Sequence, residues 1–137
     1  MSSPGFVRVQ SGAPWEEQVG YCRAVRAGPM IFVTGTVAVD EAGRPFEPGD
    51  PLAQATRCFE IIERALAQLD AGLRDVVRTR MYVTDIQNWR AVGQAHRAAF
   101  EPGHEPCATM VEVARLIDDA FLIEIEVDAV LDGSFGG

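Results

Sequence analysis

The clearest periodic pattern in the chain is an apolar stripe between residues 55 and 69. Its members recur in steps of four, three, four and three residues: Ala55, Phe59, Ile62, Leu66 and Leu69. This spacing places them on one face of an α-helix. Asp50 followed by Pro51 predicts where the helix begins, because the carboxylate can cap the first amides and proline suits the first turn. Gly72 is expected to end it.

Strict alternation marks the last strand, which we expect over residues 121–131. Its apolar side chains point one way, and the carboxylates of Glu124, Glu126 and Asp128 point the other. Other segments rich in apolar and β-branched residues predict five more strands, over 6–9, 21–26, 30–39, 75–84 and 107–114. A second helix is expected over residues 89–100, where apolar side chains share one side.

The predicted order of elements is β-β-β-α-β-α-β-β, which describes a single α+β domain over residues 1–137. Residues 1–15 and 132–137 are expected to be loose ends. Two helices cannot cover both faces of a sheet this large, so we expect both helices on one face. The other face is then left to pack against a partner subunit.

Composition and charge narrow the classes of function. A chain of 137 residues fits one domain, and 47% hydrophobic residues is an ordinary globular value. The net charge of −8 disfavours a nucleic-acid partner or an anionic membrane surface, because both bind through basic patches. The N-terminus has no apolar signal core, and no stretch approaches the ~18 apolar residues of a membrane span. We therefore expect a cytoplasmic protein.

The cysteines and histidines have no spacing that predicts a metal site or a disulfide framework. Cys22, Cys58 and Cys107 are odd in number and far apart, so we interpret them as reduced, packed thiols. His96 and His104 are eight residues apart and are interpreted as a helix-face and a loop residue. We expect no metal.

The last two strands carry a recognisable signature. The run 107–116 (CATMVEVARL), followed by 123–126 (IEIE), resembles the motif of the RidA/YjgF/L-PSP family, the reactive intermediate deaminases. The similarity extends in order along most of the chain. Three further motifs of that family are similar to Gly20-Tyr21, to the run 33–37 (VTGTV) and to the run 83–86 (VTDI).

The resemblance implies a chorismate-mutase-like fold that assembles as a homotrimer, with a small-molecule site at each subunit interface. It also implies hydrolysis of reactive enamines and imines, such as 2-aminoacrylate, to 2-oxo acids and ammonia. Members with this activity use no metal and no organic cofactor. Other members have been labelled translation inhibitors or endoribonucleases, or have no assigned activity.

The family's water-positioning carboxylate corresponds to Glu124. A glutamate suits that role because it can accept the proton of water while the C=N carbon is attacked, and a closed pocket should raise its pKa. The alternative is a solvated strand face, since Glu126 and Asp128 follow at spacings of two residues. The family's other pocket positions correspond to Tyr21, Thr34, Gly35, Ala108, Thr109 and Met110.

The family's arginine that binds the substrate carboxylate corresponds to Ala108, which offers no donor. A charge-assisted hydrogen bond contributes about 1.5–3 kcal/mol, so its loss weakens binding about 10- to 100-fold or more. The family's pocket asparagine corresponds to Gly93. Either the substrate lacks a carboxylate or another arginine has taken over, for which the candidates are Arg80, Arg97 and Arg115.

Three functions are therefore compatible with the sequence. The first is a RidA-like hydrolase of enamines or imines whose substrate preference is altered by Ala108. The second is a non-catalytic ligand-binding or protein-interaction trimer of the same fold. The third is an endoribonuclease or translation inhibitor, which the acidic charge disfavours. Fold alone cannot choose among them, because function belongs to the site.

Overall fold

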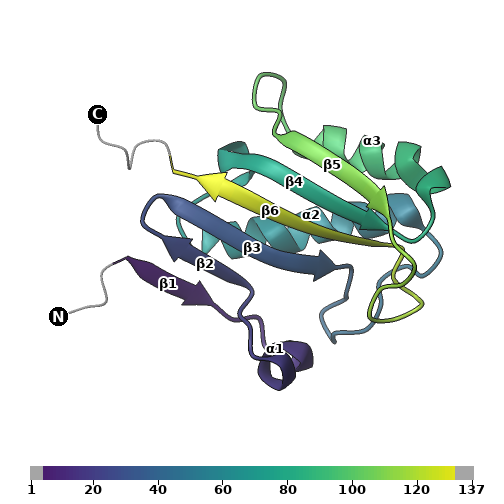
Figure 1. Ribbon diagram of the computed structural model, residues 1–137, viewed down its shortest axis with the longest axis horizontal. Helices are drawn as coiled ribbons and strands as arrows, with labels where there is room; N and C mark the ends of the chain where they lie inside the picture. The colour runs from purple at the N-terminus through teal and green to yellow at the C-terminus, as the bar shows by residue number, and fades with distance from the viewer. Residues whose placement is uncertain (1–4, 132–137) are drawn as a thin grey trace.

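The computed structural model describes residues 5–131 and contains one six-stranded sheet ordered β1-β2-β3-β6-β4-β5 (Figure 1). Neighbouring strands are antiparallel except β4 and β5, which are parallel. The strands are β1 (Phe6–Val9), β2 (Ala24–Ala27), β3 (Met30–Val37), β4 (Val76–Val83), β5 (Cys107–Glu112) and β6 (Ile123–Val130). The helices are α1 (Pro14–Val19), α2 (Pro51–Ala67) and α3 (Trp89–Ala99), with 3-10 turns η1 (Leu73–Asp75) and η2 (Ile86–Asn88).

Helices α2 and α3 pack together on one face of the sheet, behind it in Figure 1. The core lies between them and the sheet, where Ile62 and Leu66 of α2 and Ile123 and Ile125 of β6 are fully buried. The predicted α+β class with both long helices on one face is therefore observed. Among residues 5–131, no helix combines the length and the apolar character that crossing a membrane requires.

Helix α2 begins where the sequence predicts and ends earlier. The carboxylate of Asp50 accepts a hydrogen bond from the amide of Ala53 at 3.0 Å, which caps the first turn. The helix ends at Ala67 rather than at Gly72. The left-handed conformation in the following turn is adopted by Asp70, with φ of 61°, while Gly72 is extended with φ of −145°.

The N-terminal segment differs most from the expectation. Residues 1–15 were expected to be a loose end with one strand over 6–9. The strand is observed as β1, which pairs with β2, and the helix α1 that follows it was not predicted. The apolar pattern missed α1 because the buried side chain of this six-residue helix is a glutamate, Glu16. Trp15 anchors the helix edge-on against Phe121, with 6.3 Å between ring centroids. The expected loose tail at 132–137 lies outside the described residues.

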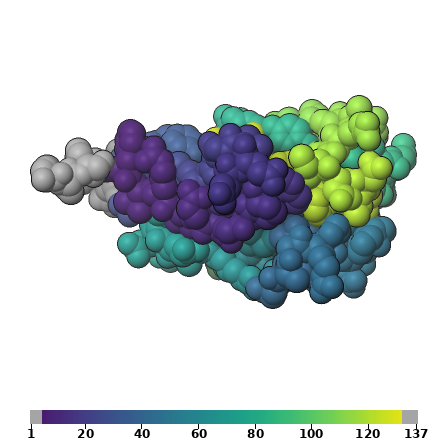
Figure 2. Space-filling view, turned by 90° about the horizontal axis from the view of Figure 1, so that it is seen from below, coloured from purple at the N-terminus to yellow at the C-terminus, as the bar shows by residue number. Residues whose placement is uncertain are grey.

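Two features of β3 prepare the site. Strand β2 is short and pairs only with the first half of β3, from Met30 to Val33, so the second half has no β2 neighbour. The register between β3 and β6 also shifts between Val33 and Thr36, which marks a β-bulge. Figure 2 shows α1 (purple) at the surface beside the connection between β5 and β6 (yellow-green). The opening beside β3 lies in this region.

Candidate functional site

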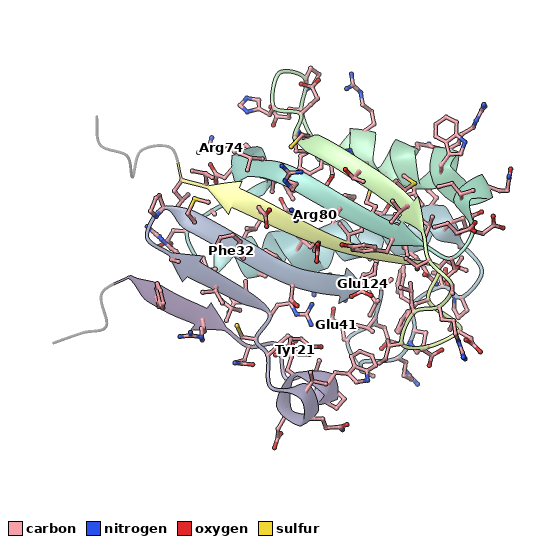
Figure 3. All side chains as sticks on the ribbon, in the orientation of Figure 1. Tyr21, Phe32, Glu41, Arg74, Arg80 and Glu124 are labelled. Carbon is pink, nitrogen blue, oxygen red and sulfur yellow. The ribbon has the colours of Figure 1, made fainter. Side chains whose placement is uncertain are left out.

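A cavity of about 890 Å³ lies beside the second half of β3. Its walls come from α1, from the turn after β3, from one side of α2 and from the connection between β5 and β6. Four of the predicted site residues line it: Tyr21, Thr34, Gly35 and Glu124. Figure 3 shows Tyr21, Glu124 and Glu41 in this one region, while Phe32 and Arg80 lie over the middle of the sheet.

The carboxylate of Glu124 lies against the backbone of Gly35. A Cβ atom at position 35 would be 2.9 Å from the carboxyl carbon of Glu124, and closer still to Oε2. Any side chain there would therefore displace the carboxylate. The glycine is needed for this close approach and not for a left-handed backbone, since its φ is not positive. Gly35 and Glu124 thus form one structural unit across β3 and β6.

Burial is the main influence on the pKa of Glu124 and raises it above the ordinary value. The neighbouring charge of Glu126 raises this pKa further, and the positive charge of Arg23 opposes the rise. Within residues 5–131, no amide or side chain donates a hydrogen bond to the Glu124 carboxylate. A half-buried carboxylate of this kind can accept a proton from a bound water molecule.

Arg23 is a site residue that the sequence analysis missed. Its Nη1 atom donates to the carbonyl of Gly35 at 3.1 Å and to Oγ1 of Thr36 at 3.2 Å, and its Nη2 atom donates to Glu16 at 3.3 Å. Glu16 also accepts hydrogen bonds from the amide and the hydroxyl of Ser11. Only 7% of Arg23 and 4% of Glu16 is exposed, so the pair is buried in the cavity wall. Nothing in the local pattern distinguishes this arginine from an exposed strand residue.

Glu41, in the turn after β3, connects this turn to α2. Its Oε2 atom accepts hydrogen bonds from Arg57 at 2.9 Å and from Arg64 at 3.0 Å. The hydrogen bond from Arg57 is the main cause of the lowered pKa of Glu41. The two ion pairs hold the turn beside the cavity, and all three side chains line it.

The other predicted site residues lie on β5, at the opposite edge of the sheet. Ala108, Thr109 and Met110 pair with β4, and both β4 and β6 separate them from β3. Ala108 and Thr109 are exposed, and Met110 packs against the core. Gly93 lies on α3. The predicted pocket is thus divided between two edges of one subunit, and a single chain does not bring its halves together.

The three arginines considered as replacements for the family's arginine lie in different places. Arg80 lies on the open face of the sheet and forms ion pairs with two carboxylates of β6, at 3.3 and 3.5 Å. Arg97 forms an ion pair with Glu105 at 3.3 Å on the surface. Arg115 lines the cavity, and its guanidinium lies 3.9 Å from the carboxylate of Asp119.

Of the remaining reactive side chains, His96 and Cys58 pack within the fold, whereas Cys107, which was expected to be packed, does not. His96 shares a 2.8 Å hydrogen bond with the hydroxyl of Thr79 and packs edge-on against Phe59, and burial lowers its pKa. Burial raises the pKa of the Cys58 thiol well above its ordinary value. Cys107 is exposed on β5. Within the part of the chain that the structure describes, no three metal-binding side chains are grouped as ligands.

Comparison with known proteins identifies the fold and the family. The fold is that of the small α+β proteins represented by Rv2704 of Mycobacterium tuberculosis, described as a member of the highly conserved YjgF/YER057c/UK114 family. That crystal structure matches with a TM-score of 0.82 and 46% identity, over 91% of this chain and 98% of the other. The chain belongs to the Endoribonuclease L-PSP family, which is the RidA/YjgF family, and the family profile matches residues 13–131.

Two curated relatives align with this chain over most of their own length. An uncharacterized Streptomyces coelicolor protein is 37% identical over 129 residues, which is 94% of this chain and 95% of that protein. The RutC family protein UK114 of Drosophila melanogaster is 30% identical over 110 residues, 80% of this chain and 78% of that protein. A putative endoribonuclease from Thermotoga maritima has a similar structure, with a TM-score of 0.77, 27% identity and coverage of 95% and 98%.

Proposed function

We propose that the protein is a RidA-like hydrolase of enamine or imine intermediates, with Glu124 as its water-activating base. The observation that carries this proposal is the position of the Glu124 carboxylate. It lies over the bare backbone of Gly35 in the cavity wall, with a raised pKa and without a hydrogen-bond donor from residues 5–131. A carboxylate that no protein group neutralises is free to hold a water molecule.

The proposed reaction uses Glu124 twice. An enamine first tautomerises to the imine, whose protonated C=N carbon is electrophilic. The water oxygen bonds to this carbon while Glu124 accepts the proton of the water. Glu124 then gives that proton to the nitrogen of the resulting carbinolamine. The C–N bond breaks, and the hydroxyl proton passes to the departing ammonia as the carbonyl forms. Ammonium and an oxo compound leave, and a carboxyl group with a raised pKa suits both proton transfers by Glu124.

The proposed active unit is a homotrimer. The face of the sheet opposite α2 and α3 carries exposed apolar side chains, including Phe32 at 44% and Val111 at 43% exposure. Such surface is typical of subunit interfaces. A neighbouring β5 that packed beside the cavity would bring Ala108 and Thr109 to Glu124. The division of the predicted pocket between two edges of the chain supports this assembly.

The proposed substrate preference follows from Ala108. An alanine cannot form the bidentate hydrogen bonds that bind a substrate carboxylate, so small acidic imines lose that anchor. Of the three candidate replacements, Arg115 lines the cavity and has a long, exposed ion pair with Asp119, whereas the other two lie away from the cavity. We propose that imines that are neutral or bulkier than 2-aminoacrylate react faster than 2-aminoacrylate does, and that Arg115 binds any acidic group that remains.

The test compares two carboxylates of β6. Imines are generated in situ, in the assay mixture, from amino-acid precursors. Ammonia release is then followed with the wild type, Glu124→Gln and Glu126→Gln. We expect kcat/KM to fall about 100-fold or more in Glu124→Gln, the usual contribution of a general base. Glu126→Gln should remain close to the wild type, because Glu126 does not line the cavity and is bound to the hydroxyl of Tyr82 at 2.9 Å. Arg115→Ala should slow acidic imines selectively.

Two outcomes would contradict the proposal. If no imine reacts faster in the presence of the protein, and Glu124→Gln behaves like the wild type, the chain is a non-catalytic trimer. RNA cleavage that survives stringent purification and disappears in Glu124→Gln would instead identify an endoribonuclease.

A further inference from the structure

Arg23 and Glu124 contact the same residue from different directions. The carboxylate of Glu124 occupies the space where a Cβ of Gly35 would be, while the carbonyl of Gly35 accepts a hydrogen bond from Nη1 of Arg23 at 3.1 Å. The same nitrogen binds Oγ1 of Thr36 at 3.2 Å, and this oxygen in turn donates to the carbonyl of Thr34 at 2.9 Å. One guanidinium thus stabilises the bulged backbone from Thr34 to Thr36, which the Glu124 carboxylate contacts.

The position of Arg23 is determined by a second group of residues. Glu16 of α1 accepts a hydrogen bond from Nη2 of Arg23, and Ser11 donates to Glu16 through both its amide and its hydroxyl. Burial alone would raise the pKa of Glu16, but the hydrogen bonds from Ser11 and the charge of Arg23 outweigh it and lower this pKa. Glu16 is therefore a charged partner that aims the guanidinium at Gly35.

Arg23 is too enclosed to bind substrate itself. Its exposed fraction is 7%, both terminal nitrogens have partners, and its Nε atom is fully buried without one. Both of its terminal nitrogens are therefore already bound to protein groups in the cavity wall.

We propose that Arg23 is a positioning residue for Glu124: it holds the Gly35 bulge in place, and its charge offsets that of Glu126. Burial and Glu126 raise the pKa of Glu124, and Arg23 is the cation that opposes them. The catalytic meaning of this inference rests on the proposed function, while its structural and electrostatic content does not. The titratable and charged groups around this site are Glu126 of β6, Tyr82 of β4, Tyr21 and Arg23 before β2, Glu16 of α1, Arg57, Cys58 and Arg64 of α2, Asp40 and Glu41 after β3, and Arg115 before β6.

The test is an NMR titration of the glutamate carboxyl carbons, with the Glu124 signal assigned from its absence in Glu124→Gln. Arg23→Gln removes the positive charge, so the titration midpoint of Glu124 should move up. Glu16→Gln leaves the charge of Arg23 without its partner, so the midpoint should move down. A role in packing alone gives no reason for shifts of opposite sign, and unmoved midpoints in both variants would overturn the proposal.

Arg23→Lys separates charge from geometry. It retains the charge but loses the planar fork that reaches Gly35 and Glu16 together, so the midpoint should stay below that of Arg23→Gln. If Arg23→Gln does not fold, the other two variants decide. An upward shift of the Glu124 midpoint in Glu16→Gln overturns the proposal. So does a shift in Arg23→Lys, relative to the wild type, that is larger than the shift in Glu16→Gln.

Kinetics provide the second measurement. In Arg23→Lys, kcat with the best imine should fall about 10- to 100-fold with KM little changed, because displacement of a catalytic group costs rate rather than binding. In Glu16→Gln, the acid limb of the pH profile of kcat/KM should move down with the NMR midpoint. If the midpoints move as expected but no imine is hydrolysed, the proposed function fails and the role of Arg23 stands.

Discussion

The two ends of β6 carry carboxylates on the same face of the sheet in different environments. Near the C-terminal end, Asp128 accepts a hydrogen bond from Arg80 at 3.3 Å, and Glu126 accepts one from Tyr82 at 2.9 Å. At the other end, no group in the described chain donates a hydrogen bond to Glu124, which lies against the backbone of Gly35.

The difference comes from the neighbouring strands and not from β6 itself. Asp128 lies opposite Phe32 of β3 and Arg78 of β4, so large side chains flank it on both sides. Glu124 lies opposite Tyr82 of β4, whose hydroxyl donates to Glu126 instead, and opposite Val37 of β3, next to the bulge where β3 has a glycine. The environment of Glu124 thus depends on what its neighbours lack: a side chain at position 35 and a donor for the carboxylate.

The largest effect is expected from Gly35→Ala, which removes the distinguishing feature of the Glu124 end. A Cβ there overlaps the carboxylate, so the catalytic group must move, and we expect kcat/KM for imine hydrolysis to fall about 100-fold. Gly72→Ala is the matched control, because its backbone is extended with φ of −145° and no atom beyond its chain neighbours lies within 4 Å of the added carbon. It lies outside the cavity and should keep full activity. Wild-type rates in Gly35→Ala would show that the carboxylate position is unimportant.

A smaller effect is expected on stability in Glu124→Gln. Because the pKa of Glu124 is raised in the folded chain, ionisation costs the folded state free energy. This cost is absent below the unfolded pKa of about 4.3 and is complete once the pH has risen above the folded pKa. Glu124→Gln should therefore raise the free energy of unfolding at pH 7, and the gain should vanish near pH 3.5, below the unfolded pKa.

Urea unfolding at the two pH values measures this difference, with Glu126→Gln as the control on the same strand. The control should show no gain at pH 7, because it weakens the hydrogen bond from Tyr82. A loss of stability in Glu124→Gln at pH 7 would mean that the carboxylate is stabilised by partners like those at the other end of β6.

The smallest effect is expected from Arg80→Met, which breaks the ion pairs at the opposite end. The side chain of Arg80 is 39% exposed, so its loss should lower the free energy of unfolding by about 0.2–1 kcal/mol, and by less at high salt. Urea unfolding at two salt concentrations tests this. A loss of about 3 kcal/mol or more, typical of a broken buried pair, would show that a neighbouring copy covers this face.

Much of the fold was predictable from local patterns. The apolar stripe of α2, its Asp50 cap and the alternation of β6 each follow from one element and its own period. The position of Glu124 followed from a motif within that strand. These features are local, because the spacing of apolar residues along a helix or a strand shows which of its sides is buried.

The tertiary structure decided what the site is made of. Helix α1 escaped prediction because the residue that it buries is Glu16, and charged residues are rarely buried unless they are paired. Its partner, Arg23, lies on another segment, and the contact of Glu124 with Gly35 joins two strands far apart in the sequence. Pairing of charges and close approach of backbones depend on how segments meet in space, so no spacing along the chain records them.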